Sequence, residues 1–267
     1  MPEILSTKEK YGICRICGKK GKLSVEHVIP KNAGGGQKTK LYDLTEVLKH
    51  EKKAHYHQKQ NGLTATTICT DCNNLLGRRY DEDFGKFYTL MNIGVEDTFR
   101  KAIDSKEIKE RNELIGKSIT LSTKQIKPFN IAKRLLAIFC SIDHENLTER
   151  IPEIRKAILN PDYKPNCKDF ALFMALKAST NDSFFATICA LRNDYKIECF
   201  AGVESQYTCF YLKDKSQNKD FPDTFGEECI NITNWLTDYE LDKEYEIQFT
   251  FPFIATKVLN IPPNKRP

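Results

Sequence analysis

The sequence predicts an α+β protein in which a small N-terminal unit with paired cysteines precedes helices and a mainly antiparallel sheet. Two CxxC pairs fall within the first 72 residues, apolar residues recur at helical spacing between residues 131 and 159, and short aromatic-rich runs follow residue 169. With 267 residues, of which 40% are hydrophobic, the chain can bury one large core or two modest ones. A disulfide-stapled miniprotein and a disordered chain are therefore excluded.

We expect three regions along the chain. Residues 1–95 form a first domain, residues 96–129 a polar connector with a possible strand in SITLST, and residues 130–267 an α+β C-terminal domain. Within the last region, IAKRLLAIFCSI and RIPEIRKAIL predict two packed helices. Strands are predicted by DFALFMAL, SFFATICAL, YKIECFAGV, YTCFYL and YEIQFTF, with RND as a hairpin turn between the second and third. Target recognition, dimerisation and partner binding remain open roles for this region.

The compartment decides how the ten cysteines are interpreted. The first residues, MPEILSTKEK, lack the features of a secretory signal, and no apolar run approaches the roughly 20 residues that cross a bilayer. We therefore expect a cytoplasmic protein without a membrane partner, whose cysteines are thiols or metal ligands. Six cysteines without paired spacing are expected to be buried free thiols: Cys140, Cys167, Cys189, Cys199, Cys209 and Cys229.

The two CxxC pairs predict a structural zinc site. Cys14 and Cys17 form CRIC, and Cys69 and Cys72 form CTDC. Two such turns supply the four sulfur ligands that a tetrahedral zinc ion prefers. The 51 residues between the pairs exceed the usual spacing, so a substantial segment is inserted between them. A redox dithiol or chance pairing is the alternative, although a redox motif needs only one CxxC.

Positive charge is concentrated in the first quarter of the chain. Residues 8–60 carry 13 Lys or Arg and five Asp or Glu, whereas residues 61–267 carry 28 Lys or Arg and 30 Asp or Glu. A local basic excess is typical of a surface that meets nucleic acid. The alternative is an ordinary lysine-rich solvated face.

An acid, a histidine and an asparagine accompany the cysteine pairs. Glu26 and His27 stand in SVEHVIPKNAGGG between the pairs, and Asn73 and Asn74 directly follow Cys72, before LLGRRYDEDF, which predicts a helix. The order CxxC, EHxxP, glycine-rich turn, CxxCN and LG closely resembles the HNH endonucleases of the ββα-metal group. The version with Glu before the histidine and CNN after the second pair resembles one bacterial subfamily. The resemblance covers roughly residues 12–88.

This resemblance implies a zinc-stabilised ββα-metal nuclease domain that hydrolyses DNA with one catalytic metal ion and leaves a 5′-phosphate. His27 has a side chain that titrates near neutral pH, so it is the candidate general base for the attacking water. Glu26 and Asn73 are the implied ligands of Mg²⁺ or Mn²⁺, which prefer oxygen donors. Asn74 is the alternative to Asn73.

Two departures from the family pattern stand out. The middle asparagine of the HNH name is replaced by Thr64, and the candidate support for His27 is Thr64, the carbonyl of its neighbour, or Asn61. The second departure is the basic insertion at residues 37–60, with histidines at positions 50, 55 and 57 that favour a metal site only weakly. Candidate phosphate contacts in and around it are Lys49, Lys52, Lys53, Lys59, Lys31, Arg78 and Arg79.

The sequence therefore favours a metal-dependent HNH endonuclease acting on DNA, with RNA as a further possible substrate. The resemblance implies a role in restriction or antiphage defence, and a homodimer or a protein partner is plausible on the same ground. The alternative from another class is a non-catalytic, zinc-anchored nucleic-acid-binding or adaptor protein, in which the altered middle position has disabled the site.

Overall fold

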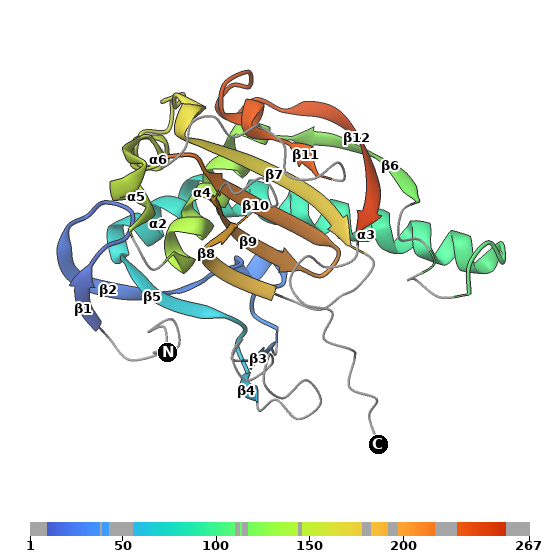
Figure 1. Cartoon of the computed structure of the whole chain (residues 1–267), viewed down its shortest axis with the longest axis horizontal. Coiled ribbons are helices and arrows are strands. Elements are labelled where there is room, and N and C mark those ends of the chain that lie inside the picture. The colour runs from blue at the N-terminus through green and yellow to red at the C-terminus, as the bar shows by residue number, and fades with distance from the viewer. Residues whose placement is uncertain are drawn as a thin grey trace.

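We describe the fold from a computed structural model of the chain. The structure describes residues 10–37, 39–42, 56–109, 113, 117–143, 146–177, 183–191, 197–216 and 229–254. Within these ranges it is a mixed α+β protein with a three-stranded sheet, a seven-stranded sheet and a two-stranded ribbon (Figure 1). The predicted fold class is confirmed at this level.

The N-terminal unit is a three-stranded antiparallel sheet followed by a helix. Its strands lie in the order β1-β2-β5, and β5 leads directly into α2. The two-stranded ribbon of β3 and β4 holds the ends of the long insertion, and residues 43–55 lie outside the described part of the chain. The bounds are Lys10–Ile13 for β1, Lys20–His27 for β2, Thr39–Tyr42 for β3, Tyr56–Lys59 for β4, Thr64–Cys69 for β5 and Thr70–Arg79 for α2.

The region expected to be a connector is built into the rest of the fold. Helix α3 (Asp81–Asp104) runs without a break through the boundary expected after residue 95, and β6 (Ser118–Ile126) pairs with β12 in the large sheet. Polar residues on the outer side of α3 made its apolar inner face hard to recognise in the sequence. The side chains of the inner face recur at helical spacing and are buried: Phe84, Phe87, Tyr88, Met91, Val95 and Phe99. This stretch is therefore a structural part of the core.

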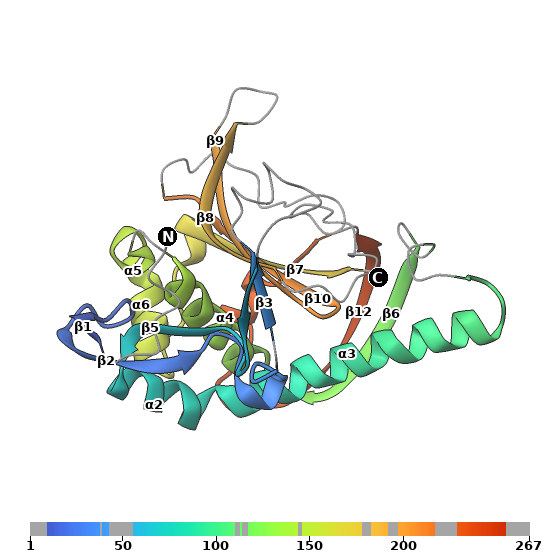
Figure 2. The ribbon, with the colours of Figure 1, turned by 90° about the horizontal axis from the view of Figure 1, so that it is seen from below.

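Helix α4 (Pro128–Ile142) is the centre of the molecule, and all of its residues are buried. It contacts β5 of the small sheet and β8 and β10 of the large one (Figure 2). Proline at its first position suits a helix start, because proline lacks the N–H that would be left unpaired there. The expected helical segment at 150–159 is also confirmed, as α5 (Leu147–Arg150) and α6 (Pro152–Leu159).

The large sheet contains all five strands predicted from the aromatic-rich runs. Its order is β6-β12-β7-β10-β9-β8, with β11 paired to β7, and its pairs are antiparallel except β12 with β7. Strands β8 and β9 are antiparallel neighbours as expected, although the turn at residues 192–194 is outside the described part. The bounds are Phe170–Lys177 for β7, Ser183–Leu191 for β8, Ile197–Ser205 for β9, Thr208–Asp214 for β10, Ile230–Asn231 for β11 and Tyr245–Ile254 for β12.

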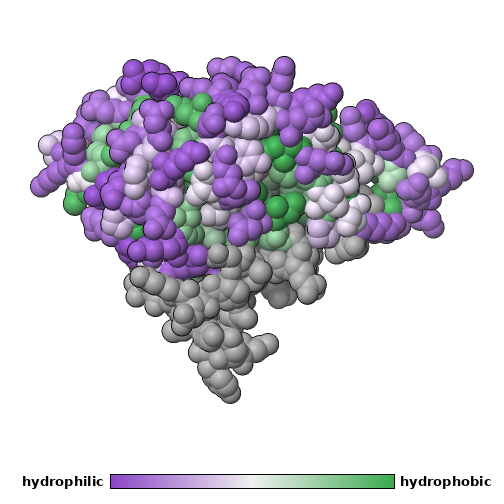
Figure 3. Space-filling model, turned by 90° about the horizontal axis from the view of Figure 1, so that it is seen from above, coloured by the Kyte–Doolittle hydropathy of each residue, from purple (hydrophilic) through white to green (hydrophobic). Residues whose placement is uncertain are grey.

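One hydrophobic cluster joins the N-terminal unit to the C-terminal region, and it extends from Cys14 to Phe253. Its centre is aromatic, with Phe87 and Trp235 in edge contact at 5.5 Å between ring centroids. The surface seen in Figure 3 is mainly hydrophilic, and its apolar residues form separate small patches. Within the described residues, no helix is both long and apolar enough to cross a membrane.

The unpaired cysteines are not all free thiols. Cys140 and Cys209 are buried thiols as expected, and Cys167 and Cys229 are half-buried thiols. Cys199, however, is disulfide-bonded, so the expectation of a free thiol is wrong for this residue. Spacing along the chain gave no signal for it, because the pairing of Cys199 depends on the register of β8 and β9, which places it opposite position 189.

Candidate functional site

Four cysteines form a compact cluster at the base of the N-terminal sheet. The sulfur atoms of Cys14, Cys17, Cys69 and Cys72 all lie within 4.8 Å of one another. The distance from Cys17 Sγ to Cys69 Sγ is 3.8 Å. Sulfurs at about 2.3 Å from a tetrahedral zinc ion are separated by about 3.8 Å, so the donor set and its spacing fit zinc.

The two turns place these sulfurs by different local means. Cys14 and Cys17 lie in a tight turn after β1, in which the Gly18 amide donates to the Cys14 carbonyl at 2.8 Å. Gly18 has a φ of 75°, a conformation that favours glycine. Cys69 ends β5 and caps α2, and Cys72 lies in the first turn of that helix. The positive end of the helix dipole favours thiolates at both positions.

The thiols are electrostatically coupled. A hydrogen bond with Cys72 is the main cause that lowers the pKa of Cys14 to about 4. The same contact, together with burial and the nearby negative charge, raises the pKa of Cys72, and burial raises that of Cys17. Four adjacent sulfurs cannot all ionise without a cation between them. A bound zinc ion removes this conflict.

Helices of the C-terminal region hold the first cysteine turn. Arg155 of α6 donates to the Ile16 carbonyl at 3.0 Å, and the Thr148 hydroxyl of α5 donates to the Arg15 carbonyl at 2.8 Å. Arg15 in turn donates to the Ser141 carbonyl of α4 at 2.8 Å. The cysteine turn is therefore fixed from both sides, by its sulfurs and by its backbone carbonyls.

Glu26 is buried, with 3% of its surface exposed, on the side of β2 that faces the protein interior. Thr67 Oγ1 donates to its Oε1 at 3.1 Å, whereas Oε2 is buried with no hydrogen-bond partner in the described structure. Burial raises the pKa of Glu26 to about 7, against the opposing influence of the Arg134 charge and the Ser141 and Thr67 hydroxyls. Neighbours on a strand point to opposite sides, and Glu26 and His27 do so in their burial.

His27 ends β2 and is half-buried. The Asn61 backbone accepts a hydrogen bond from its ring, and Nε2 is a buried atom with no partner in the described structure. Burial and the Lys31 charge lower the pKa of His27, so the ring is neutral at physiological pH.

The support for His27 comes from a backbone group. The sequence left Asn61 and Thr64 open for this role, and the strand register places Thr64 opposite His27 while the Asn61 carbonyl takes the hydrogen bond. Asn73 is half-buried and Asn74 exposed, both in the first half of α2. Among the described residues, no hydrogen bond or ion pair connects Glu26, His27 and Asn73 with one another.

Arg134 is a residue near the site that the sequence did not reveal. Its side chain is 3% exposed, and its Nε lies 2.5 Å from Asp81 Oδ1. Its Nη2 donates to the His27 carbonyl at 3.5 Å, and its Nη1 is buried without a partner in the described structure. Arg134 therefore connects the end of β2 to α4 and to the start of α3. A contact with a backbone carbonyl 107 positions away leaves no signature in the sequence.

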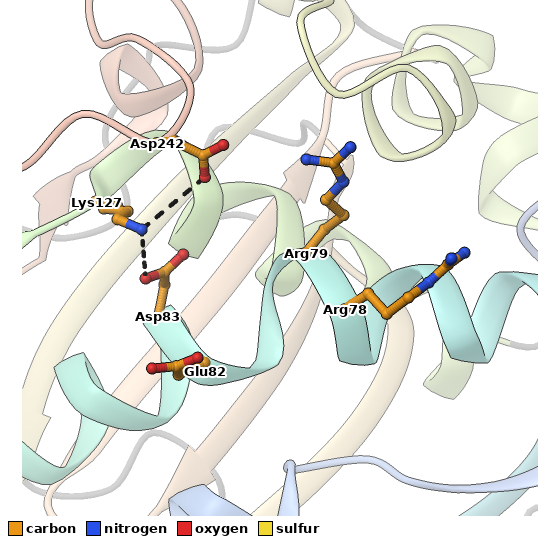
Figure 4. Close-up of a pocket in the computed structure, with 6 residues that line it drawn as sticks. All are labelled: Arg78, Arg79, Glu82, Asp83, Lys127 and Asp242. Carbon is orange, nitrogen blue, oxygen red and sulfur yellow. Dashed lines mark ion pairs between the residues drawn. The ribbon is translucent and has the colours of Figure 1, made fainter.

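Arg78 and Arg79 are exposed in the last turn of α2, where the helix dipole favours cations. They border a pocket of about 320 Å³, and Figure 4 shows the Arg78 side chain directed away from the ion pair of Lys127 with Asp83. The pocket is lined by three cationic side chains and three carboxylates, so it has no net positive charge that would favour a phosphate inside it. Its lining residues are Arg78, Arg79, Glu82, Asp83, Lys127 and Asp242.

Two further sets of predicted residues stand apart from this geometry. Lys49, Lys52 and Lys53 lie outside the described residues, as do two of the three insertion histidines and the side chain of the third.

Comparisons of the chain with family models, with curated proteins and with solved structures find no match. The site is therefore defined by its own geometry: a four-cysteine cluster, and a histidine held by a carbonyl at the end of the middle strand.

Proposed function

We propose that the chain is a metal-dependent endonuclease of the HNH type that hydrolyses phosphodiester bonds in DNA. The observation that carries this proposal is the state of His27, whose ring is held by the Asn61 carbonyl while Nε2 has no partner among the described residues. A neutral imidazole with an unpartnered nitrogen suits a general base, although this nitrogen is buried here and would have to become open to the attacking water. The strand–strand–helix order around it, closed by four cysteines, supports the same family.

In this mechanism, His27 Nε2 accepts a proton from the water that attacks phosphorus. Lys31, whose charge already lowers the His27 pKa, is close enough to attract a phosphate group. The resemblance implies that Glu26 and Asn73 would hold Mg²⁺ or Mn²⁺; Glu26, on the interior side of β2, would have to turn toward the His27 side to do so. When bound, such an ion neutralises the charge that develops on the leaving oxygen. Activity of this kind would serve restriction or antiphage defence.

One observation favours a second candidate, a nucleic-acid-binding adaptor without catalysis. Glu26 is buried on the interior side of β2, away from His27, and burial raises its pKa to about 7, as expected for a structural carboxyl in the interior. In an adaptor the zinc unit would bind nucleic acid, and His27 would have only a packing role.

Cleavage of supercoiled plasmid separates the two candidates. With Mg²⁺ or Mn²⁺ we expect nicking by the wild type and a loss of about 10²- to 10⁴-fold in rate for His27→Ala, because a general base contributes about that factor. His144→Ala, a histidine in the C-terminal half of the sequence, is the matched control. His27→Ala should retain its zinc, its melting temperature and its affinity for DNA. Binding without cleavage under either ion supports the adaptor, and a parallel RNA substrate decides between the two nucleic acids.

A further inference from the structure

The outer face of β1 and β2 exposes apolar side chains that the fold does not bury. Tyr11 is 70% exposed and Ile13 54% exposed, and both lie on β1, the edge strand of the small sheet. Val25 on β2 is 42% exposed. These two strands lie at one end of the molecule in both ribbon views (Figures 1 and 2). An exposed aromatic ring on an edge strand beside a second exposed apolar residue is a feature to be explained.

The same face is positively charged. In the antiparallel register Tyr11 lies opposite Lys22, and Ile13 opposite Lys20, so these four side chains share one side of the sheet. Both lysines are exposed. Residues 10–37 contain six Lys or Arg and a single acidic residue, Glu26, which is buried. The charge that this segment presents to solvent is therefore entirely positive.

The face continues along β2 to His27. Lys20, Lys22 and Val25 are exposed and His27 is half-buried, whereas Leu23 and Glu26 are buried. An irregularity between Ser24 and Glu26 accounts for the change in alternation. Lys22 and His27 are five residues apart, or about 17 Å along an extended strand.

We propose that this face, defined by Tyr11, Ile13, Lys20 and Lys22, binds a single-stranded segment of the nucleic-acid substrate. The proposal rests on the nuclease function above and names its substrate as nucleic acid with unpaired bases close to the cleaved bond. Lysines attract the phosphates, and the Tyr11 ring stacks on a base, which requires a base that is free of a duplex stack. An apolar protein partner would not require the uniform positive charge.

Binding measurements on the full-length His27→Ala protein test this proposal without interference from cleavage. Fluorescence anisotropy would use a labelled oligonucleotide of about 16 nucleotides, as a single strand and as a duplex. We expect Tyr11→Ala to weaken single-strand binding about tenfold, while Tyr11→Phe, which keeps the ring, binds as the parent does. Duplex binding should change less than about twofold.

Two further variants separate charge from stacking. Lys20→Gln should weaken binding to both oligonucleotides and reduce the slope of log Kd against log salt by about 0.7 for the single strand. Leu90→Ala removes an exposed apolar residue of α3, outside this face, and should change nothing. All variants should match the parent in melting temperature, because these positions are exposed.

The proposal is overturned if Tyr11→Ala binds the single strand as tightly as Leu90→Ala does, or if it weakens duplex binding equally. It is also overturned if sedimentation shows that Tyr11→Ala converts a dimer to a monomer, since the face would then hold a second copy of the chain. Failure of the nuclease assignment appears separately. In that case the wild type would cleave nothing, while the effect of Tyr11 on binding would remain.

Discussion

The N-terminal zinc unit and the region around α4 are stabilised in different ways. The zinc unit has short strands, an exposed outer face and four sulfurs that require a cation, whereas α4 is buried along its whole length between two sheets. The first has four cysteines placed to hold a metal ion in addition to its share of the core, and the second depends on apolar packing. The comparison teaches that the candidate base His27 belongs to the sheet that carries the four-cysteine cluster, while Arg134 of α4 connects the His27 backbone to the packed core.

The largest expected effect comes from removing a zinc ligand. Cys69→Ser should lose the zinc ion and unfold the N-terminal unit, because binding of a structural zinc contributes about 10 kcal/mol or more to folding. Metal analysis and hydrogen exchange of β1, β2 and β5 would measure this. Cys167→Ser, outside the cluster, is the matched control. Equal zinc content and equal thermal stability of Cys69→Ser and wild type would contradict the assignment.

A core substitution in α4 tests the other half of the comparison. Leu136 is fully buried, and Leu136→Ala should reduce the free energy of unfolding by about 2 to 5 kcal/mol through lost burial and a cavity. Zinc should remain bound under conditions where the variant is folded. Chemical denaturation followed by circular dichroism gives the magnitude. A change below about 1 kcal/mol would mean that α4 is not the packed centre of the fold.

The smallest expected effect depends on pH. Because burial raises the folded pKa of Glu26 to about 7, the folded state keeps a proton between about pH 4.5 and pH 7 that the unfolded state has released. Stability from this group therefore falls as pH rises through that window. Relative to wild type, Glu26→Gln should have a similar free energy of unfolding at pH 4.5 and one about 3 kcal/mol higher above pH 7.

Melting curves at several pH values, with zinc bound and without Mg²⁺ or Mn²⁺, would measure this difference. A Glu26→Gln variant that shows the same offset from wild type at every pH would indicate that the carboxyl is ionised in the folded protein. Glu26 would then be better described as a charged group than as a buried neutral one.

Much of the fold follows from local patterns in the sequence. The helical spacing of 131–142 and the aromatic-rich strands are periodic, so they predict α4 and the large sheet directly. The cysteine pairs predict their cluster because each CxxC is a local turn. The inner face of α3 was harder to recognise, because its exposed charges made the stretch resemble a connector.

The surroundings of the site were less accessible from the sequence. The support for His27 is a backbone carbonyl, which any residue at position 61 would provide. The burial of Glu26 depends on Thr67 and on α4, which are distant in the chain. Residue types and spacing indicate candidate chemistry, whereas the partners of each side chain depend on how separate elements pack.

The zinc site is the claim on which the account depends most, and X-ray absorption at the zinc edge tests it most directly. For protein purified without added metal, the account predicts one zinc ion per chain with four sulfur neighbours at about 2.3 Å and no nitrogen or oxygen neighbour. Absence of zinc, or a mixed shell that includes nitrogen, would contradict the four-cysteine site and remove the frame that holds His27.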